Sequence, residues 1–394
     1  MVNLFREESC MAERVEAIVK PELLIWARKS IGLDLTLAAK RAGTTEERLL
    51  NWEEGKQRPT ISQLRRMGDV YKRPIAAFYL PAPPKSFNLI KDFRQISEKQ
   101  VHEYSPTLLY EIRRAYSRRE SAIELYKDVE GIMPPIALPK KTSGNVEKLG
   151  QTIREFLGVS YERQRQWKTD RESFNGWRLA IESKNILVFQ ASRIRVDEMR
   201  GFSIGKTPFP VIVVNIQDTL VARTFTLLHE FAHLTMGKEG ICDLTGHADL
   251  EVSGNAIAAA TLVPKKSFLA EPEFQNKKAS GWSDNGISKL ASRYKVSREV
   301  ILHRLHTMDS ISSKFYKNKS AQYREERAEQ MQKVKQKKTG FAPPDRMVVS
   351  SCGKLYSRLV LNSYRNEKIT ASDASDLLAV KIKYFPKIEM AIFG

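Results

Sequence analysis

The residues best suited to chemistry in this chain lie in the sequence Leu228-His229-Glu230-Phe231-Ala232-His233. Residues four apart share one face of a helix, so the imidazoles of His229 and His233 can bind one Zn²⁺. Glu230 then lies on the neighbouring side, where its carboxylate can polarise a metal-bound water. The flanking residues are apolar nearly all round the helix, and buried imidazoles and a buried carboxylate need a partner to offset desolvation. The spacing therefore predicts a zinc site with Glu230 as its catalytic group.

Three downstream side chains are candidates for the third zinc ligand: His247, Asp249 and Glu251. Glu251 precedes the apolar run 256–260, so a second buried helix can bring its carboxylate to the metal from the other side. Two His and one Glu with an open fourth position form a known catalytic zinc arrangement. We therefore predict Glu251 as the third ligand. His247 follows Gly246 in a predicted loop, where we expect it to be exposed; a substrate contact, an oxyanion contact and a substitute ligand are the alternatives.

The site needs helices and a scaffold to position it. Residues 224–236 and 256–262 have the composition of apolar helices, and 186–189 and 211–215 that of buried strands. Proline-rich stretches near 81–84 and 134–139 mark boundaries. We expect an α+β, mostly helical chain in four parts: a five-helix bundle over 15–81, a helical linker region over 82–140, a mixed domain with a small sheet over 141–310, and a basic tether with a C-terminal helical unit over 311–394.

Composition limits the classes of protein that this chain can belong to. The 394 residues carry a net charge of +19 and are 42% hydrophobic, which predicts folded domains and favours an acidic or nucleic-acid partner. No stretch of about 18 apolar residues is present, so we expect no membrane span. Three widely spaced cysteines, Cys10, Cys242 and Cys352, do not form a disulfide framework, and the expected location is the cytoplasm.

The N-terminal segment has the pattern of a helix-turn-helix. Gly43 marks a turn, Thr44 or Thr45 is placed to cap the next helix, and Leu49, Leu50 and Trp52 are expected to form the buried face of that helix. The run Leu35 to Pro59, with Trp52-Glu53-Glu54-Gly55-x-x-x-Pro59 at its end, resembles the XRE (lambda-repressor-like) helix-turn-helix.

Such a module implies double-stranded DNA as a partner. The residues that we predict to contact DNA are Thr45, Arg48, Asn51, Lys56 and Arg58. Glu46 and Glu47, at the start of the recognition helix, weaken nonspecific affinity for phosphates, although acidic side chains can accept a hydrogen bond from cytosine. A protein-recognition module built on the same bundle is the rival interpretation.

The central domain also resembles a known family. The run from Phe225 to His233, then Glu251-x-x-x-Asn255 and the apolar stretch 258–264, is similar to the ImmA/IrrE metallopeptidases. The resemblance spans roughly 145–310 and implies a zincin-like fold, with His229, His233 and Glu251 as Zn²⁺ ligands and Glu230 as general base. It also implies cleavage of a repressor or antitoxin partner.

The leading hypothesis is thus a zinc endopeptidase that acts on a repressor-like, antitoxin-like or neighbouring toxin protein and is fused to a DNA-binding module. An extended substrate is expected to pair with a strand edge near Gly201 to Ser203. The alternatives are a DNA-binding regulator or antitoxin with little or no proteolytic activity, and a scaffold that neutralises a neighbouring toxin by contact. A homodimer is possible under any of them.

Overall fold

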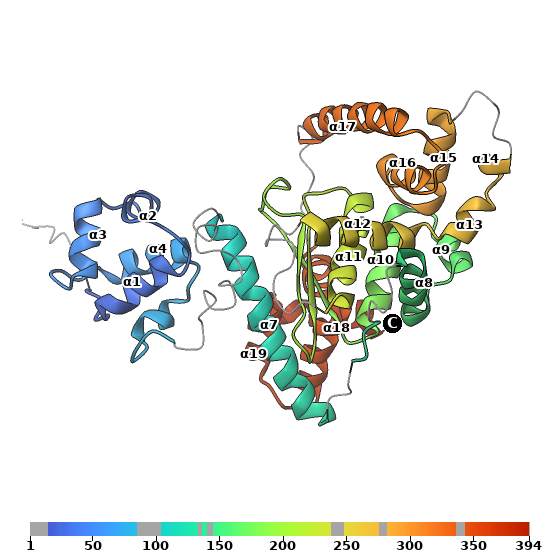
Figure 1. Ribbon diagram of the computed structural model, residues 1–394. Coiled ribbons are helices and arrows are strands. Elements are labelled where there is room, and N and C mark those ends of the chain that lie inside the picture. The colour runs from blue at the N-terminus through green and yellow to red at the C-terminus, as the bar shows by residue number, and fades with distance from the viewer. Residues whose placement is uncertain are drawn as a thin grey trace, which may run out of the picture. The chain divides into compact units, whose positions relative to one another are not determined.

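The computed structural model describes residues 15–84, 104–132, 136–139, 145–237, 248–275, 282–335 and 343–393. The chain divides into two compact units, Met1–Ile112 and Arg113–Gly394, which are described separately below. The expected α+β, mostly helical fold class is confirmed: helices dominate and the described residues contain one three-stranded sheet (Figure 1). Among these residues no helix combines the length and the apolar composition that a membrane span requires. Cys10, Cys242 and His247 lie outside the described residues.

The first unit is a bundle of short helices, each begun by a side-chain cap or a proline. It comprises α1 (Pro21–Lys29), α2 (Leu35–Ala42), α3 (Glu46–Glu53), α4 (Ile61–Tyr71) and the 3₁₀ helix η1 (Ile75–Tyr79). Asp34, Thr45 and Thr60 accept backbone hydrogen bonds at the starts of α2, α3 and α4, which satisfies N–H groups that have no partner within the helix. The predicted bundle therefore has a 3₁₀ helix as its fifth member.

The core of this bundle lies where α3 and α4 meet α1 and α2. Leu49 and Trp52 are buried as predicted, but Leu50 is 41% exposed, so its assignment to the buried face was wrong. The reason is helical geometry: Leu50 follows Leu49 by one residue and points about 100° away from it. Arg28 and Glu53 form a bidentate ion pair, with both N–O distances 2.7 Å, that ties α1 to α3.

In the second unit, the sheet is a middle layer. Its strands are β1 (Leu187–Ala191), β2 (Gly201–Ile204) and β3 (Val211–Asn215), in the order β1-β3-β2. β1 is parallel to β3, with Leu187 opposite Val211, and β2 is antiparallel to β3, with Gly201 opposite Val214. Because side chains alternate between faces, Val188, Ile212 and Val214 join the main apolar core on one face, whereas Phe189 points to the other.

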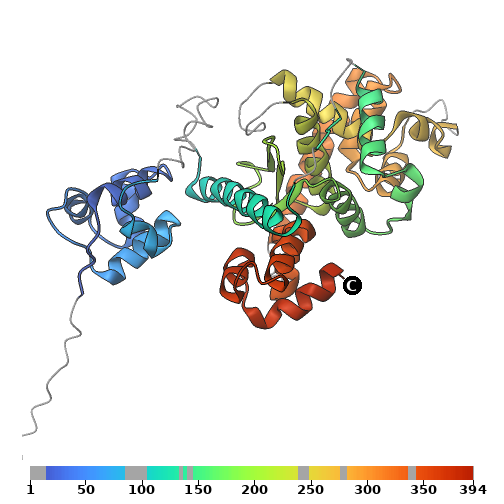
Figure 2. The same ribbon diagram turned by 90° about the horizontal axis from the view of Figure 1, so that it is seen from below.

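Helices cover both faces of this sheet. The first face packs against the main core, which draws on α8 (Val146–Leu157), α10 (Asp170–Glu182), α11 (Leu220–Thr235) and α12 (Ala248–Leu262). On the second face, the ring of Phe189 meets Tyr356 edge-on at 5.7 Å and lies under the guanidinium of Arg118 at 5.1 Å. Tyr356 belongs to α18 (Pro344–Arg365) and Arg118 to α7 (Pro106–Glu130). Figure 2 shows the C-terminal helices gathered below the sheet.

The remaining helices extend the main core. They are α9 (Tyr161–Gln166), α13 (Lys265–Leu269), α14 (Pro272–Gln275), α15 (Asp284–Tyr294), α16 (Arg298–Thr307) and α17 (Ser313–Lys335). α17 packs against α16, and its Tyr323 is 2% exposed, so the first part of the expected basic tether is bound to the main core. After α18, the chain ends in α19 (Ala371–Leu378), the 3₁₀ helix η3 (Ile382–Tyr384) and α20 (Phe385–Phe393).

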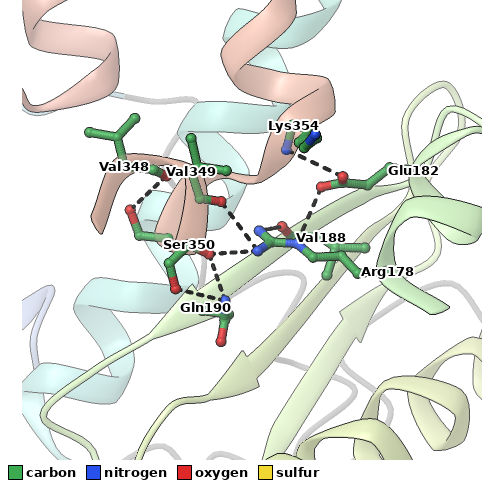
Figure 3. Close-up of polar contacts among 9 residues, drawn as sticks. Arg178, Glu182, Val188, Gln190, Val348, Val349, Ser350 and Lys354 are labelled. Carbon is green, nitrogen blue, oxygen red and sulfur yellow. Dashed lines mark hydrogen bonds and ion pairs between the residues drawn. The ribbon is translucent and has the colours of Figure 1, made fainter. Parts of the chain in front are cut away.

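A buried polar cluster attaches α18 to the sheet (Figure 3). The guanidinium of Arg178, on α10, donates hydrogen bonds to the carbonyl of Ser350 at 2.8 Å and to that of Val188 at 2.6 Å. Its Nε lies 3.4 Å from the carboxylate of Glu182, one helical turn later. Because these bonds go to backbone atoms of both β1 and α18, Arg178 links three elements at once.

Two further features fit α18 to this cluster. Gln190 donates to the Ser350 carbonyl at 2.7 Å, and the Lys354 amide donates to Glu182 at 3.2 Å. Between these contacts the helix is broken at Gly353, whose φ of 81° and ψ of 162° are accessible essentially to glycine alone. A Cβ there would lie 2.1 Å from the Glu182 carboxylate oxygen, so glycine is also needed for the close approach.

Candidate metal centre

The two imidazoles of the predicted zinc site lie side by side on α11. Thr219 caps this helix by accepting the Ala222 amide, and twelve of its sixteen residues are buried. His229 and His233 are four residues apart, and their Nε2 atoms approach to 3.0 Å. Burial of nearly the whole helix holds both rings in the interior, where His229 is 6% and His233 1% exposed. The structure therefore brings these two residues together, as the sequence spacing predicts.

Glu251, in the first turn of α12, completes a three-residue group. Its Oε2 lies 3.2 Å from His229 Nε2 and its Oε1 lies 3.3 Å from His233 Nε2. A tetrahedral zinc ion with bonds of about 2.0–2.1 Å has ligand atoms about 3.3 Å apart. The three side chains, all of types that zinc binds, therefore fit one zinc ion with a fourth position open. Asp249, the other candidate within the described residues, is exposed and lies outside this group.

Hydrogen bonding keeps the Glu251 carboxyl ionised. Burial raises the pKa of this group, but hydrogen bonds and charge interactions with the two imidazoles outweigh that effect and lower the pKa to about 2. An anionic carboxylate beside two imidazole nitrogens is the protonation state that a divalent cation needs in its ligands. The electrostatics of the group therefore agree with its geometry.

Two glycines make room for this arrangement. A Cβ on Gly254, one helical turn after Glu251, would lie 3.0 Å from His229 Cε1 and 3.2 Å from His233 Nε2. A Cβ on Gly201, at the start of β2, would lie 3.3 Å from Cγ of Glu230 and 2.5 Å from the Thr226 side chain. Glycine at these positions thus lets α12 approach the imidazoles and lets the sheet approach Glu230.

Glu230 shares a cleft with the metal group, defined as the three candidate ligands His229, His233 and Glu251. The cleft has a volume of about 1000 Å³, and Glu230, although its exposed fraction is 0%, contributes to its floor together with His229 and Glu251. Arg200, immediately before β2, lines the same cleft. Glu230 is adjacent to His229 in sequence and sits against Gly201, so the predicted general base lies between the metal group and the start of an edge strand.

A further wall of the cleft was not predicted from the sequence. It is made by α16 and α17, with Arg298 and His303 on the first helix and Tyr316, Tyr323 and Arg324 on the second. The sequence of α17 is rich in charge, which made it resemble a solvated tether. The available signal was the heptad spacing of Tyr316 and Tyr323, which places both rings on one helical face.

The residues predicted to contact DNA lie on α3 and in the turn after it. Thr45 is the N-cap of α3 and accepts the Arg48 amide at 3.3 Å, so its hydroxyl also has a structural role. The side chain of Arg48 is exposed and that of Asn51 is half-buried. In the following turn Arg58 is exposed, and Lys56 forms a surface ion pair with Glu54. The structure places all five on one helix-and-turn segment.

Two family models match separate parts of the chain. A peptidase family model described as the IrrE N-terminal-like domain matches residues 182–306, and a helix-turn-helix family model matches residues 24–78. The first span holds the sheet, α11 and α12, and ends within α16; α17 and the C-terminal helices lie beyond it. The comparisons with curated proteins and with solved structures returned no match. One segment of the chain is thus similar to an IrrE-like peptidase domain and another to a helix-turn-helix, the two resemblances that its sequence predicted.

Proposed function

We propose that this protein is a zinc-dependent endopeptidase that cleaves a specific repressor-like or antitoxin-like protein partner. The observation that carries the proposal is the convergence of His229, His233 and Glu251 within 3.3 Å of one another, with Glu230 in the same cleft. His229, His233 and Glu251 would hold the ion. Zinc, when bound, supplies Lewis acidity that polarises a carbonyl and makes water a better nucleophile at neutral pH.

The residues of the chain divide the remaining chemistry among them. Glu230 takes a proton from the attacking water and passes it to the amine that leaves when the peptide bond breaks. Its burial against Gly201 keeps the carboxylate out of bulk water while the residue lines the cleft. The apolar packing of α11 fixes Glu230 relative to the two imidazoles, so the general base and the ligands keep one geometry through the reaction.

An edge strand offers a place for an extended substrate. β2 is the outer strand on one side of the sheet and begins at Gly201, against Glu230. A peptide that adds to this edge by main-chain hydrogen bonds would run past the general base. The placement supports cleavage of an exposed, extended segment of a protein in preference to a folded one.

The helix-turn-helix supports a second part of the proposal, namely that the protein binds double-stranded DNA through α3 and the turn after it. Arg48 and Arg58 are exposed there, which suits contacts to phosphates and base edges. Glu46 accepts a hydrogen bond from Thr36 at 2.8 Å, which holds its carboxylate near the start of α2. We expect the affinity to be modest and sensitive to salt.

A comparison of the wild type with Glu230→Gln tests the peptidase. Both proteins, loaded with zinc, are incubated with a lysate of cells that carry the native chain, and new protein N-termini are identified by mass spectrometry. The wild type is expected to generate a small set of new N-termini that Glu230→Gln does not, while both retain one zinc per chain. Identical N-termini from both proteins would refute the enzymatic proposal and favour a regulator without proteolytic activity.

DNA binding is tested independently of cleavage. Selection from a random duplex pool with the Glu230→Gln protein is expected to enrich one sequence. Arg58→Ala is expected to weaken binding to that sequence and to make the logarithmic salt slope shallower by about 0.9 if Arg58 contacts a phosphate. Lys72→Ala, at the C-terminal cap of α4, is the control on the same unit. A failure to enrich any duplex would favour protein recognition by this module.

A further inference from the structure

One wall of the cleft that holds the metal group carries a histidine with no assigned role. His303, on α16, lines the same cleft as His229, Glu230 and Glu251. α16 packs against α12, the helix that carries Glu251, and Asn255 and Ala259 on that helix line the cleft with Glu251 at intervals of four residues. One face of α12 therefore connects the metal group to the wall that holds His303.

An aromatic ring from α17 holds this imidazole in place. The ring of Tyr316 meets His303 edge-on, with centroids 6.4 Å apart, and also lines the cleft. His306, one turn later on α16, stacks on the same Tyr316 ring at 4.6 Å and lies 3.1 Å from the Ser313 hydroxyl. The two histidines thus share a packing partner, but only His303 is among the residues that line the cleft.

His303 is suited to donate a hydrogen bond beside a cation. Burial lowers the pKa of its imidazole, and the nearby charges of Arg304 and His306 lower it further. The ring is therefore neutral at pH 7 and has one N–H group to donate. A neutral donor adds no positive charge next to a bound divalent ion, unlike the guanidiniums of Arg298 and Arg324 on the same wall.

We propose that His303 is a further catalytic residue, which donates a hydrogen bond to the oxygen of the scissile carbonyl as that oxygen becomes an anion. This inference rests on the proposed peptidase function. As water oxygen bonds to the carbonyl carbon, the π electron pair moves to the carbonyl oxygen and Glu230 takes the water proton. An electron pair of that oxygen then re-forms the carbonyl double bond as the carbon–nitrogen bond breaks; the pair of the broken bond goes to nitrogen, and Glu230 returns the proton there. His303 keeps its proton throughout and binds the oxygen most strongly when that oxygen is charged.

The test uses the full-length, zinc-loaded protein with His303→Ala, His303→Gln and His306→Ala. His306→Ala is the matched control because it removes an imidazole from the same helix and the same Tyr316 ring. Three quantities are measured for each variant: zinc content with the melting temperature, kcat and KM on the peptide that the wild type cleaves fastest in a quenched-fluorescence library, and the dissociation constant of acetohydroxamate, which presents a partly anionic oxygen to the metal.

The expected result separates the two histidines. His303→Ala should lower kcat by about 10²–10³-fold with KM nearly unchanged, since one oxyanion donor is removed. It should also weaken acetohydroxamate binding, while His303→Gln, which retains an N–H donor, recovers part of both losses. His306→Ala should match the wild type in kcat and in inhibitor affinity.

Two different failures can be told apart. Equal kcat and equal acetohydroxamate affinity for His303→Ala and His306→Ala, with an active wild type, would overturn the role of His303. A loss of zinc or of thermal stability in His303→Gln as well as in His303→Ala would assign His303 a structural role and overturn the proposal too. A wild type that cleaves neither the library nor a lysate protein, and matches Glu230→Gln, would instead remove the peptidase function on which the inference rests.

Discussion

Two buried polar clusters in the second unit differ in how their charges are balanced. Around Arg178, the guanidinium faces the carboxylate of Glu182 and the carbonyls of Val188 and Ser350, so donors meet acceptors within the chain (Figure 3). In the metal group, two imidazole nitrogens and a carboxylate converge on one another at 3.0–3.3 Å. All three are groups that bind a cation through lone pairs.

The difference separates structural from functional burial. Burial of a closed cluster costs desolvation free energy, which raises the pKa of Glu182 and lowers that of Arg178. Hydrogen bonds between the elements offset this cost, so the ion pair persists in the interior. A convergent ligand cluster gains its compensating charge from an ion, so its geometry is maintained by the packing of α11 and α12. Substitutions in the first cluster should therefore lower the free energy of unfolding, and substitutions in the second should weaken metal binding.

The largest expected effect is on the closed cluster. Arg178→Met leaves Glu182 buried without its cation and removes the hydrogen bonds to β1 and α18, so the free energy of unfolding should fall by about 3–5 kcal/mol. Arg195→Met is the control, because Arg195 and its partner Asp197 are 80% and 73% exposed, and it should change stability by less than about 1 kcal/mol. Chemical denaturation measures the free energy of unfolding of both variants. Equal losses would show that the cluster around Arg178 stabilises the fold no more than an exposed ion pair does.

Gly353→Ala should destabilise the same attachment somewhat less. The substitution places a Cβ against Glu182 and forces alanine into a backbone region that it avoids, for a cost of about 2–3 kcal/mol. At Gly158, the left-handed C-cap of α8, an added Cβ would meet no atom within 4 Å, so Gly158→Ala should cost only about 1 kcal/mol. If both variants melt at the same temperature, the close packing of α18 on α10 does not contribute to the stability of the fold.

His233→Ala should reverse this pattern at the metal group. Zinc at 100 times its dissociation constant should stabilise the wild type by about 2.7 kcal/mol and His233→Ala hardly at all, because a ligand of the folded state is lost. In the presence of a chelator the two proteins should differ much less than the wild type and Arg178→Met do. Calorimetry with and without zinc provides the measurement, and a zinc-dependent shift in His233→Ala as large as that in the wild type would contradict the ligand set.

The smallest expected effect tests the fit around the imidazoles. Gly254→Ala puts a methyl group 3.0–3.2 Å from both rings, so zinc affinity should fall about tenfold, or about 1.4 kcal/mol, as the rings shift by a few tenths of an ångström. Gly286→Ala, in the first turn of α15, meets only Ser283 Oγ at 3.4 Å and should leave zinc affinity unchanged. Competition with a zinc chelator compares them, and unchanged affinity in Gly254→Ala would show that α12 can move away from the imidazoles.

The local features of this protein follow from residue types and spacing alone. The four-residue interval of His229 and His233, a threonine cap at position 44 or 45 and the apolar strands are short-range patterns. The structure has the cap at Thr45, and β1 runs two residues past the predicted strand 186–189. Leu50 shows the limit of such patterns, because an apolar residue at the edge of a buried face can be exposed.

What only the tertiary structure decided is which distant segments meet. Glu251 follows His233 by eighteen residues, and the sequence offered other candidates; the crossing of α11 and α12, made possible by Gly254, places the carboxylate on the imidazoles. Likewise α17 has a polar sequence, yet Tyr316 and Tyr323 form a wall of the cleft, and α18 reaches β1 through Arg178. Spacing along a helix is set by backbone geometry, whereas contacts between helices depend on the packing of many side chains at once, which no short stretch of sequence contains.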